Sequence, residues 1–205
     1  MSDYPDRQKF LQAVKNQLEP NIFKHSLAVE ACMGGIYDYL KSVNGLQVNE
    51  LAGFESKKED WMLSGLIHDI DYSGEYKIFH PNKTLEVLAK YNLTISDDVH
   101  NIIKAHAPEK TGYYPKSKAE WALFCADSLT GLIVAVALVY PSKKLADVKL
   151  SSVMKRFLKE PKFAAGTRRE DIKKCQLKEG LNIPLEKFVE ICLESMKKIA
   201  GEIGL

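Results

Sequence analysis

The residues of this sequence that could do chemistry centre on His68 and Asp69, which directly follow an apolar helical stretch at 61–67. Imidazole and carboxylate groups together are typical ligands of a transition-metal ion. Neighbouring residues on a regular helix point about 100° apart, so the pair can meet one ion only where the helix ends. Asp71 and Gly74 follow in a stretch that ends the helical pattern. The pair alone is equally consistent with a helix C-terminus, where a histidine compensates the dipole and an aspartate caps.

Three further histidines stand where they could face the same centre. His25 lies among small and apolar residues of a long predicted helix. His80 precedes Pro81, which suits the first helical position, and the helix dipole would then keep this imidazole neutral and able to bind a metal. His106 shares the apolar stripe of its helix, whereas His100 falls on the opposite face and is expected to contact water. Taken singly, such a histidine is more often a hydrogen-bonded core residue than a ligand.

The apolar stretch 119–140 carries Asp127 in its middle. An ionised carboxylate there costs several kcal/mol unless it is paired or binds a metal. The stretch contains no lysine or arginine, so the partner must be a metal ion or a basic side chain from another element. Glu120, Asp127 and Ser128 leave fewer than the ~20 apolar residues that a membrane span requires. We therefore expect the central buried helix of a domain that does not associate with a membrane.

Helical periodicity predicts an all-α protein without convincing strands. Ser56 and Glu59 are predicted to form a capping box at the start of the helix that leads to His68, and Gly65 would let another backbone approach it closely. The other helices are predicted at about 1–18, 21–40, 81–91, 99–106, 119–140 and 184–204, with a loop at 41–55. We expect one domain over 1–205, with a metal-site core at about 21–140 and a basic C-terminal helical extension at about 141–205.

The bulk composition fits an ordinary globular protein. A chain of 205 residues is long enough for one domain with a dry core. The first residues have neither the basic region nor the apolar core of a secretory signal, which predicts a cytoplasmic protein. The four cysteines are widely spaced, form no Cys-x-x-Cys motif and fall mostly in apolar helical contexts, so we expect buried free thiols.

Basic charge is concentrated at 141–178, which holds twelve Lys or Arg against four Asp or Glu. These side chains could contact a substrate phosphate, and arginine in particular can bind two phosphate oxygens at once. The alternative is that most of them are solvated helix faces. Only two phenylalanines interleave with the basic residues, which argues against nucleic acid as a partner because there is no stacking platform. The candidates for phosphate binding are Lys83, Lys143, Lys144, Arg168 and Arg169.

The order of these residues resembles the HD-domain superfamily of metal-dependent phosphohydrolases, whose signature is a histidine, a His-Asp pair and a distant aspartate on an all-helical scaffold. Family members with two metal ions add two intervening histidines. The matching positions here are His25, His68, Asp69, His80, His106 and Asp127. The segments 127–147 and 163–169 also resemble a prokaryotic subgroup described only as predicted HD hydrolases. The resemblance covers nearly the whole chain, and it implies an HD-domain helical bundle that binds one or two divalent ions of Fe, Mn, Mg, Zn, Ni or Co.

The resemblance also implies the roles of the six residues. Asp69 would bridge two ions, with His25, His68 and Asp127 completing one coordination sphere and His80 and His106 the other. Asp69 and His68 would act as the catalytic pair, through a metal-activated hydroxide that attacks a phosphate ester. The implied substrate is small and phosphorylated, a nucleotide or another phosphomonoester.

One departure from the family pattern narrows this expectation. Many two-metal phosphodiesterases read His-Asp-Ile-Gly-Lys, whereas Asp71 and Tyr72 take the last two positions here, which argues against cleavage of cyclic dinucleotides. Asp71 is expected to cap the helix or to orient a water molecule. Two alternatives stay open: the same ligands hold two irons in HD-fold oxygenases, and a non-catalytic module could combine a structural metal with binding of an anionic partner.

Overall fold

The computed structural model describes residues 6–43 and 56–205, and every regular element within these ranges is a helix. The all-α prediction is therefore confirmed for the described residues, while most of the loop predicted at 41–55 lies outside them. The elements, in which η marks a short 3-10 helix, are α1 (Arg7–Gln17), α2 (Pro20–Val43), α3 (Lys58–Ile67), η1 (Gly74–Phe79), α4 (Thr84–Lys90), α5 (Asp97–Ala105), α6 (Pro108–Thr111), α7 (Lys118–Val139), η2 (Leu145–Asp147), α8 (Leu150–Lys159), α9 (Arg169–Lys173), η3 (Lys174–Gln176), α10 (Leu185–Lys198) and α11 (Ala200–Ile203).

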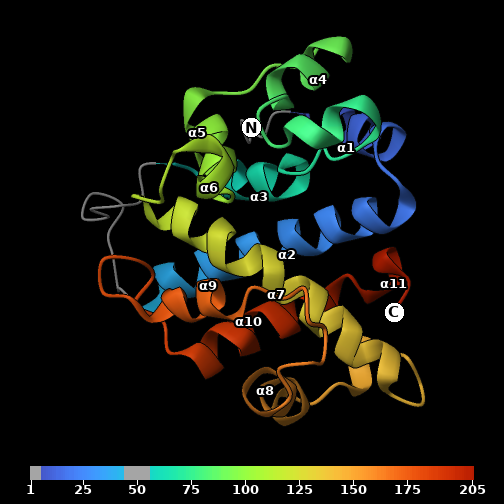
Figure 1. Cartoon of the computed structure of the whole chain (residues 1–205), viewed down its shortest axis with the longest axis vertical. Coiled ribbons are helices and arrows are strands. Elements are labelled where there is room, and N and C mark those ends of the chain that lie inside the picture. Colours follow the sequence, from blue (N-terminus) through green and yellow to red (C-terminus); the bar gives the residue numbers. More distant parts are fainter. Residues whose placement is uncertain (1–5, 44–55) are drawn as a thin grey trace.

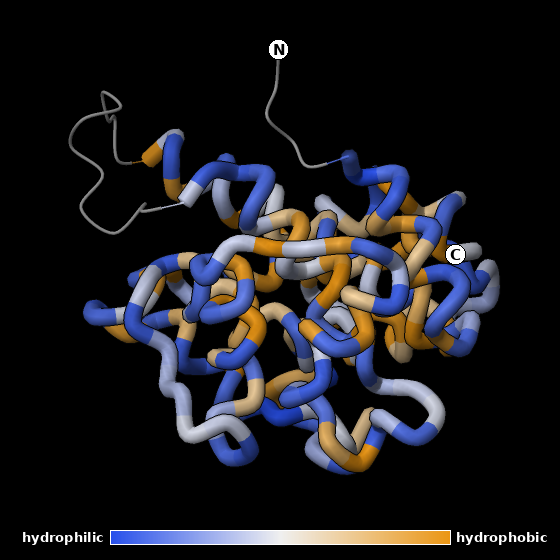
Figure 2. The backbone as a smooth tube through the Cα atoms, turned by 90° about the horizontal axis from the view of Figure 1, so that it is seen from above, coloured by the Kyte–Doolittle hydropathy of each residue, from blue (hydrophilic) through white to orange (hydrophobic). Residues whose placement is uncertain are grey.

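Two long helices, α2 and α7, cross near the middle of the molecule and pack against each other (Figure 1). On one side α3 packs on α2, and α5 packs on both α3 and α7; on the other side α10 packs on α2 and α9 on α7. Apolar side chains from these helices form one continuous core. Hydrophilic residues dominate the outer turns in Figure 2. The arrangement brings the N-terminal part of α2 and the middle of α7 next to the C-terminal ends of α3 and α5.

The central helix α7 is apolar on most of its circumference. Leu123, Leu129 and Ile133 are fully buried, and the prediction of a buried central helix is confirmed. By length and composition α7 is the one helix of the described residues that could cross a membrane, and most of it is buried inside the protein. Its start is fixed by a capping box in which Ser117 and Glu120 each accept a hydrogen bond from the other's backbone amide.

The start of α3 differs from the prediction by one residue. The backbone amide of Lys57 donates to Asp60 Oδ2 at 3.2 Å, while the Ser56 hydroxyl accepts a hydrogen bond from Trp61 Nε1 at 3.0 Å. The predicted capping box of Ser56 and Glu59 is therefore wrong, because the buried indole of Trp61 uses the serine hydroxyl. Gly65 confirms its predicted role: a Cβ there would lie 2.9 Å from the backbone of Glu30 in α2.

Two further boundaries differ from the sequence pattern. Pro81 does not begin a helix, because α4 starts at Thr84 and the amide of Lys83 donates to the carboxylate of Asp71. The predicted C-terminal helix divides at Ile199 into α10 and α11. The four cysteines are buried and free, as predicted.

Candidate metal centre

The six predicted ligands come from five places in the fold and meet at one cavity. His25 lies on α2 and Asp127 on α7, while the other four residues follow helix ends: His68 and Asp69 come directly after α3, His80 after η1, and His106 after α5. A cavity of about 340 Å³ is lined by five of the six, and His68 is completely buried next to them. Helix ends supply most of the ligands because successive side chains can converge there.

Asp69 lies between two groups of histidines. Its Oδ2 is 3.7 Å from His25 Nε2 and 3.4 Å from His68 Nε2, whereas its Oδ1 is 3.3 Å from His80 Nε2. The candidate ligand atoms of His25, His68 and Asp69 lie within 4.8 Å of one another, and so do those of Asp69, His80 and His106. One carboxylate thus presents a different oxygen to each group, which is the arrangement needed to bridge two ions.

Asp127 joins the first group and also has a basic partner. Its Oδ1 lies 3.0 Å from His25 Nε2 and 3.8 Å from His68 Nε2. Its Oδ2 accepts a hydrogen bond from Arg168 Nη2 at 2.8 Å. The partners of this partly buried carboxylate therefore include a cation from another element, Arg168, which directly precedes α9. One oxygen is neutralised by arginine, and the other faces the imidazoles.

All four imidazoles are oriented in the same way, with Nδ1 outward and Nε2 toward the centre. Each Nδ1 has an acceptor, so Nδ1 carries the hydrogen and Nε2 keeps a lone pair that can bind a metal. The Thr130 hydroxyl accepts from His25 because it donates its own hydrogen to the Asp127 carbonyl. The acceptors are Thr130 Oγ1 for His25 (3.0 Å), Gly65 O for His68 (2.8 Å), Asp71 Oδ1 for His80 (2.7 Å) and Ile103 O for His106.

In the neutral imidazoles, the Nε2 atoms that point to the centre are hydrogen-bond acceptors, and they face other acceptors. His80 Nε2 and His106 Nε2 lie 3.2 Å apart, and His25 Nε2 lies 3.0 Å from Asp127 Oδ1. His68 Nε2 is buried and has no hydrogen-bond partner among the described residues. Lone pairs in these positions repel one another unless a proton or a cation lies between them. The residues present therefore fit one or two divalent ions.

In the metal-free cluster a proton on His68 takes the place of a cation between these acceptors. Burial disfavours the charged forms of Asp69 and Asp127, yet the imidazoles of His68 and His25 outweigh it and hold the pKa of both carboxyls below its ordinary value. Burial alone would lower the pKa of His68, but the two carboxylates raise it to about 9. Burial and the charge of His68 lower the pKa of His106 to about 4. A metal ion that bound here would have to displace the His68 proton, whereas His106 is neutral near pH 7.

Asp71 has a role that differs from both sequence-based expectations. It is fully buried, and it neither caps α3 nor lies among the described residues that line the cavity. Its Oδ1 accepts from His80 Nδ1 at 2.7 Å, and its Oδ2 accepts from the Lys83 amide at 2.8 Å. Asp71 therefore orients a candidate ligand, as carboxylates behind metal-binding histidines commonly do. Its position two residues after Asp69 is the one signal that the sequence offers.

Of the five predicted phosphate-binding residues, one lines the metal cavity and four lie elsewhere. Arg168 lines the metal cavity, together with Lys110, which the sequence did not single out. The other four are not among the described residues of that lining. Lys83 Nζ pairs with Glu86 at 2.6 Å, the turn after α7 leaves two lysines exposed, and the guanidinium of Arg169 donates to backbone carbonyls. The residues placed elsewhere are Lys83, Lys143, Lys144 and Arg169.

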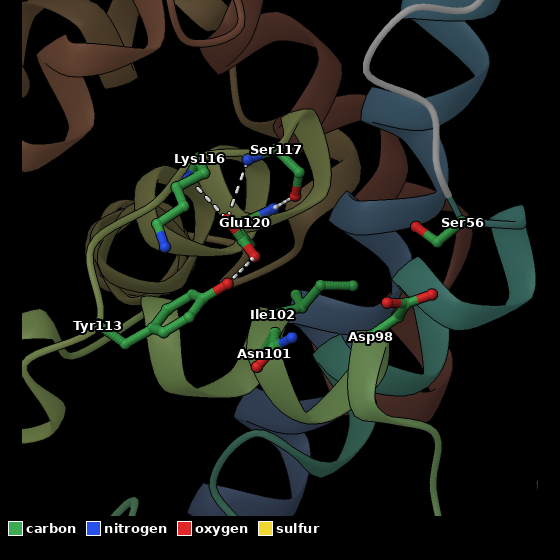
Figure 3. A pocket seen from close by; sticks show the side chains of 8 residues that line it. All are labelled: Ser56, Asp98, Asn101, Ile102, Tyr113, Lys116, Ser117 and Glu120. Carbon is green, nitrogen blue, oxygen red and sulfur yellow. Dashed lines mark hydrogen bonds between the residues drawn. The ribbon is translucent and has the colours of Figure 1, made fainter.

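A second polar cavity, of about 230 Å³, lies between α5 and the start of α7 (Figure 3). Its buried carboxylate, Glu120, accepts hydrogen bonds from the Tyr113 hydroxyl at 2.9 Å and from the amides of Lys116 and Ser117 at 2.6 and 2.9 Å. No histidine is among the described residues that line it. These donors satisfy the hydrogen-bonding capacity of Glu120, whose role is to cap the start of α7. We therefore assign the residues around this cavity a structural role.

Comparison of the chain with protein-family models, curated proteins and solved structures finds no match. The chemistry of the centre is therefore inferred from its donor atoms, its cavity and its charges. Four imidazole nitrogens and two carboxylates suit transition-metal ions. Structural zinc sites are usually closed by four protein ligands, whereas this cluster opens into a cavity that can admit water or a small ligand.

Proposed function

We propose that this protein is a metal-dependent phosphohydrolase of the HD-domain type that hydrolyses a small phosphomonoester, such as a nucleotide. The observation that carries the proposal is the position of Asp69, whose two oxygens face separate histidine groups beside a cavity that also contains Arg168. A dinuclear site suits in-line displacement at phosphorus, and an arginine suits the phosphoryl oxygens.

The two groups of ligands would hold one ion each. His25, His68 and Asp127 would share the first ion with Asp69 Oδ2, and His80 and His106 would share the second with Asp69 Oδ1. Divalent ions held there would lower the pKa of a water molecule toward 7 and neutralise charge on the phosphoryl group.

Arg168 is the residue best placed to bind the phosphoryl oxygens. Besides Asp127, its guanidinium lies 3.7 Å from Glu109 and 3.4 Å from Asp171, so three carboxylates orient it. Its side chain remains 37% exposed and lines the cavity. When Asp127 binds an ion, part of its negative charge is neutralised, and the arginine is freer to pair with an incoming phosphate. Lys110 adds a second positive charge to the same wall.

Hydrolysis of phenyl phosphate and other small phosphomonoesters by manganese-loaded protein tests this function. Asp69→Ala should lose both bound metal and hydrolysis while its far-UV circular dichroism stays helical. Asp98→Ala removes an exposed carboxylate of α5 and is the matched control, which should retain both. Metal binding without hydrolysis of any ester would contradict the proposal, and oxygen consumption by an iron-loaded form would favour the oxygenase instead.

A further inference from the structure

A second compartment, of about 300 Å³, adjoins the metal cavity along α7. The two share His25, Asp127, Ser128 and Gly166 in their walls, so they are continuous. One wall of the new compartment is α7, and the other is the loop of residues 160–168 between α8 and α9. A molecule that reaches the metal centre can therefore extend directly into this space.

The two compartments differ in charge. The metal cavity is lined by Arg168, Lys110 and Glu109 in addition to the candidate ligands. In the part of the chain that the structure describes, the second compartment is lined by small or neutral residues, apart from the shared His25 and Asp127. An anionic group there would find no lysine or arginine in the lining, and the neighbouring cation, Arg168, already pairs with Asp127. The second compartment therefore suits a neutral group.

The loop that forms the outer wall is held by Arg169. Its guanidinium donates to the carbonyl oxygens of Phe157 at 3.2 Å and Glu160 at 3.3 Å, and also to those of Phe163 and Ala164. Ala164 has a φ of +46°, a left-handed conformation that residues other than glycine seldom adopt. Contacts from one side chain to four carbonyls stabilise this conformation. The wall is thus preformed, which lowers the entropic cost of binding a ligand against it.

We propose that the neutral alcohol portion of the phosphomonoester binds in this second compartment, between Gly131 and Ala164–Gly166, and that the missing side chain of Gly131 leaves room for it. The inference rests on the proposed phosphohydrolase function. Gly131 is exposed, and a Cβ built there meets no described atom within 4 Å beyond its chain neighbours and the nearby backbone of its own helix, so there is space at this point. A volume of about 300 Å³ is small for a ligand pocket and suits a group of ring size.

The test compares two ligands that differ by one neutral ring. Binding of inorganic phosphate and of phenylphosphonate, which cannot be hydrolysed, is measured by calorimetry on manganese-loaded protein. Gly131→Leu should weaken phenylphosphonate binding at least about tenfold but change phosphate binding less than about twofold, because a few misplaced carbon atoms have effects of this size in pockets. Gly131→Ala should have a smaller effect of the same sign. Gly201→Leu makes the same change at an open glycine of α11 and is the control.

A second pair of ligands tests the charge argument. 4-Phosphonobenzoate adds one carboxylate to the same ring and should bind the wild-type protein more weakly than phenylphosphonate. Equal binding of phenylphosphonate and 4-phosphonobenzoate would overturn the inference. So would a Gly131→Leu substitution that leaves phenylphosphonate binding unchanged, or that weakens phosphate binding by the same factor. Failure of the wild-type protein to bind phenylphosphonate would also overturn it. Hydrolysis of phenyl phosphate is scored separately. Hydrolysis without sensitivity of binding to Gly131 contradicts only this inference, whereas sensitive binding without hydrolysis contradicts only the phosphohydrolase function.

Discussion

The helix α7 carries two carboxylates, two turns apart, in opposite environments: Glu120 is buried and Asp127 is partly buried. Glu120 is surrounded by donors from 113–117, all within seven residues in sequence. Asp127 is surrounded by His25, His68 and Arg168, which come from distant parts of the chain. The hydrogen bonds of Glu120 come from residues close in sequence at the start of the helix, whereas the partners of Asp127 are brought to it by the tertiary fold.

The difference shows what separates a structural carboxylate from a candidate ligand. The hydrogens around Glu120 already point at its oxygens, so no further partner is required (Figure 3). Around Asp127 and Asp69, the imidazoles direct lone pairs inward and their hydrogens outward. Burial of a carboxylate therefore does not identify the candidate metal site. The direction in which the neighbouring N–H and O–H groups point identifies it.

The largest expected contrast is the response to a metal ion. At about 1,000 times its dissociation constant, manganese should raise the free energy of unfolding by about 4 kcal/mol for each ion bound. Asp127→Ala should lose the part of this gain that comes from the ion shared with His25 and His68, and Glu120→Ala should keep the whole gain, as measured by urea unfolding with manganese and with a chelator. A full gain in Asp127→Ala would show that the ion binds elsewhere.

Removing Glu120 should instead lower the stability of the metal-free protein. Glu120→Ala leaves two backbone amides and a tyrosine hydroxyl without their acceptor, so the free energy of unfolding should fall by about 2–3 kcal/mol. Metal content should not change. Glu86→Ala removes an exposed carboxylate of α4 and should cost far less. A loss of bound metal in Glu120→Ala would contradict the assignment of Glu120 as a structural carboxylate and Asp127 as a metal ligand.

A smaller effect is expected from the carboxylate behind His80. Asp71→Asn leaves one amide oxygen for two donors, His80 Nδ1 and the Lys83 amide, and should weaken metal binding by about 10- to 100-fold. The loss should fall on the ion held by His80 and His106, as titration calorimetry can resolve. Asp98→Asn is the control on the surface. An unchanged affinity would return Asp71 to a purely structural role.

The last expected effect is a pH dependence of the metal-induced stabilisation, small for any single pH unit. The pKa of His68, raised to about 9 by the carboxylates, means that its charge stabilises the metal-free protein fully below pH 6.5 and progressively less as pH rises through 9. Because a metal ion must displace this proton, the gain from manganese should increase from pH 6.5 to 9, by at most about 1.4 kcal/mol per pH unit. His100→Ala, which alters the histidine outside the centre, should leave this trend intact. A gain that falls over this range contradicts the assignment.

Helical spacing and residue type were sufficient to predict much of this architecture. The apolar stripes predicted the all-α fold and the buried α7. The six candidate ligands were found because imidazoles and carboxylates at helix ends or among apolar residues need partners, and a family resemblance grouped them into one centre. Gly65 was predicted to allow a close approach because its lack of a side chain is a local property.

Other features depended on contacts between distant segments and could not be predicted. The pairing of Arg168 with Asp127 joins residues 41 positions apart. The role of Asp71 depends on where His80 and Lys83 lie in the fold. The Lys83 amide donates to Asp71, and α4 begins at the next residue, Thr84, three residues after Pro81. Among five basic candidates for phosphate binding, sequence gave no basis for choosing Arg168, because the choice depends on which element faces the cavity.

The most direct measurement of the central claim is the metal content of the purified protein by elemental analysis, repeated on His80→Ala and His106→Ala. If Asp69 bridges two ions, the wild type should hold about two ions per chain and each variant about one, because only the second group loses a ligand. A single ion that is unaffected by either substitution would contradict the dinuclear centre and leave His80 and His106 with structural or substrate-binding roles.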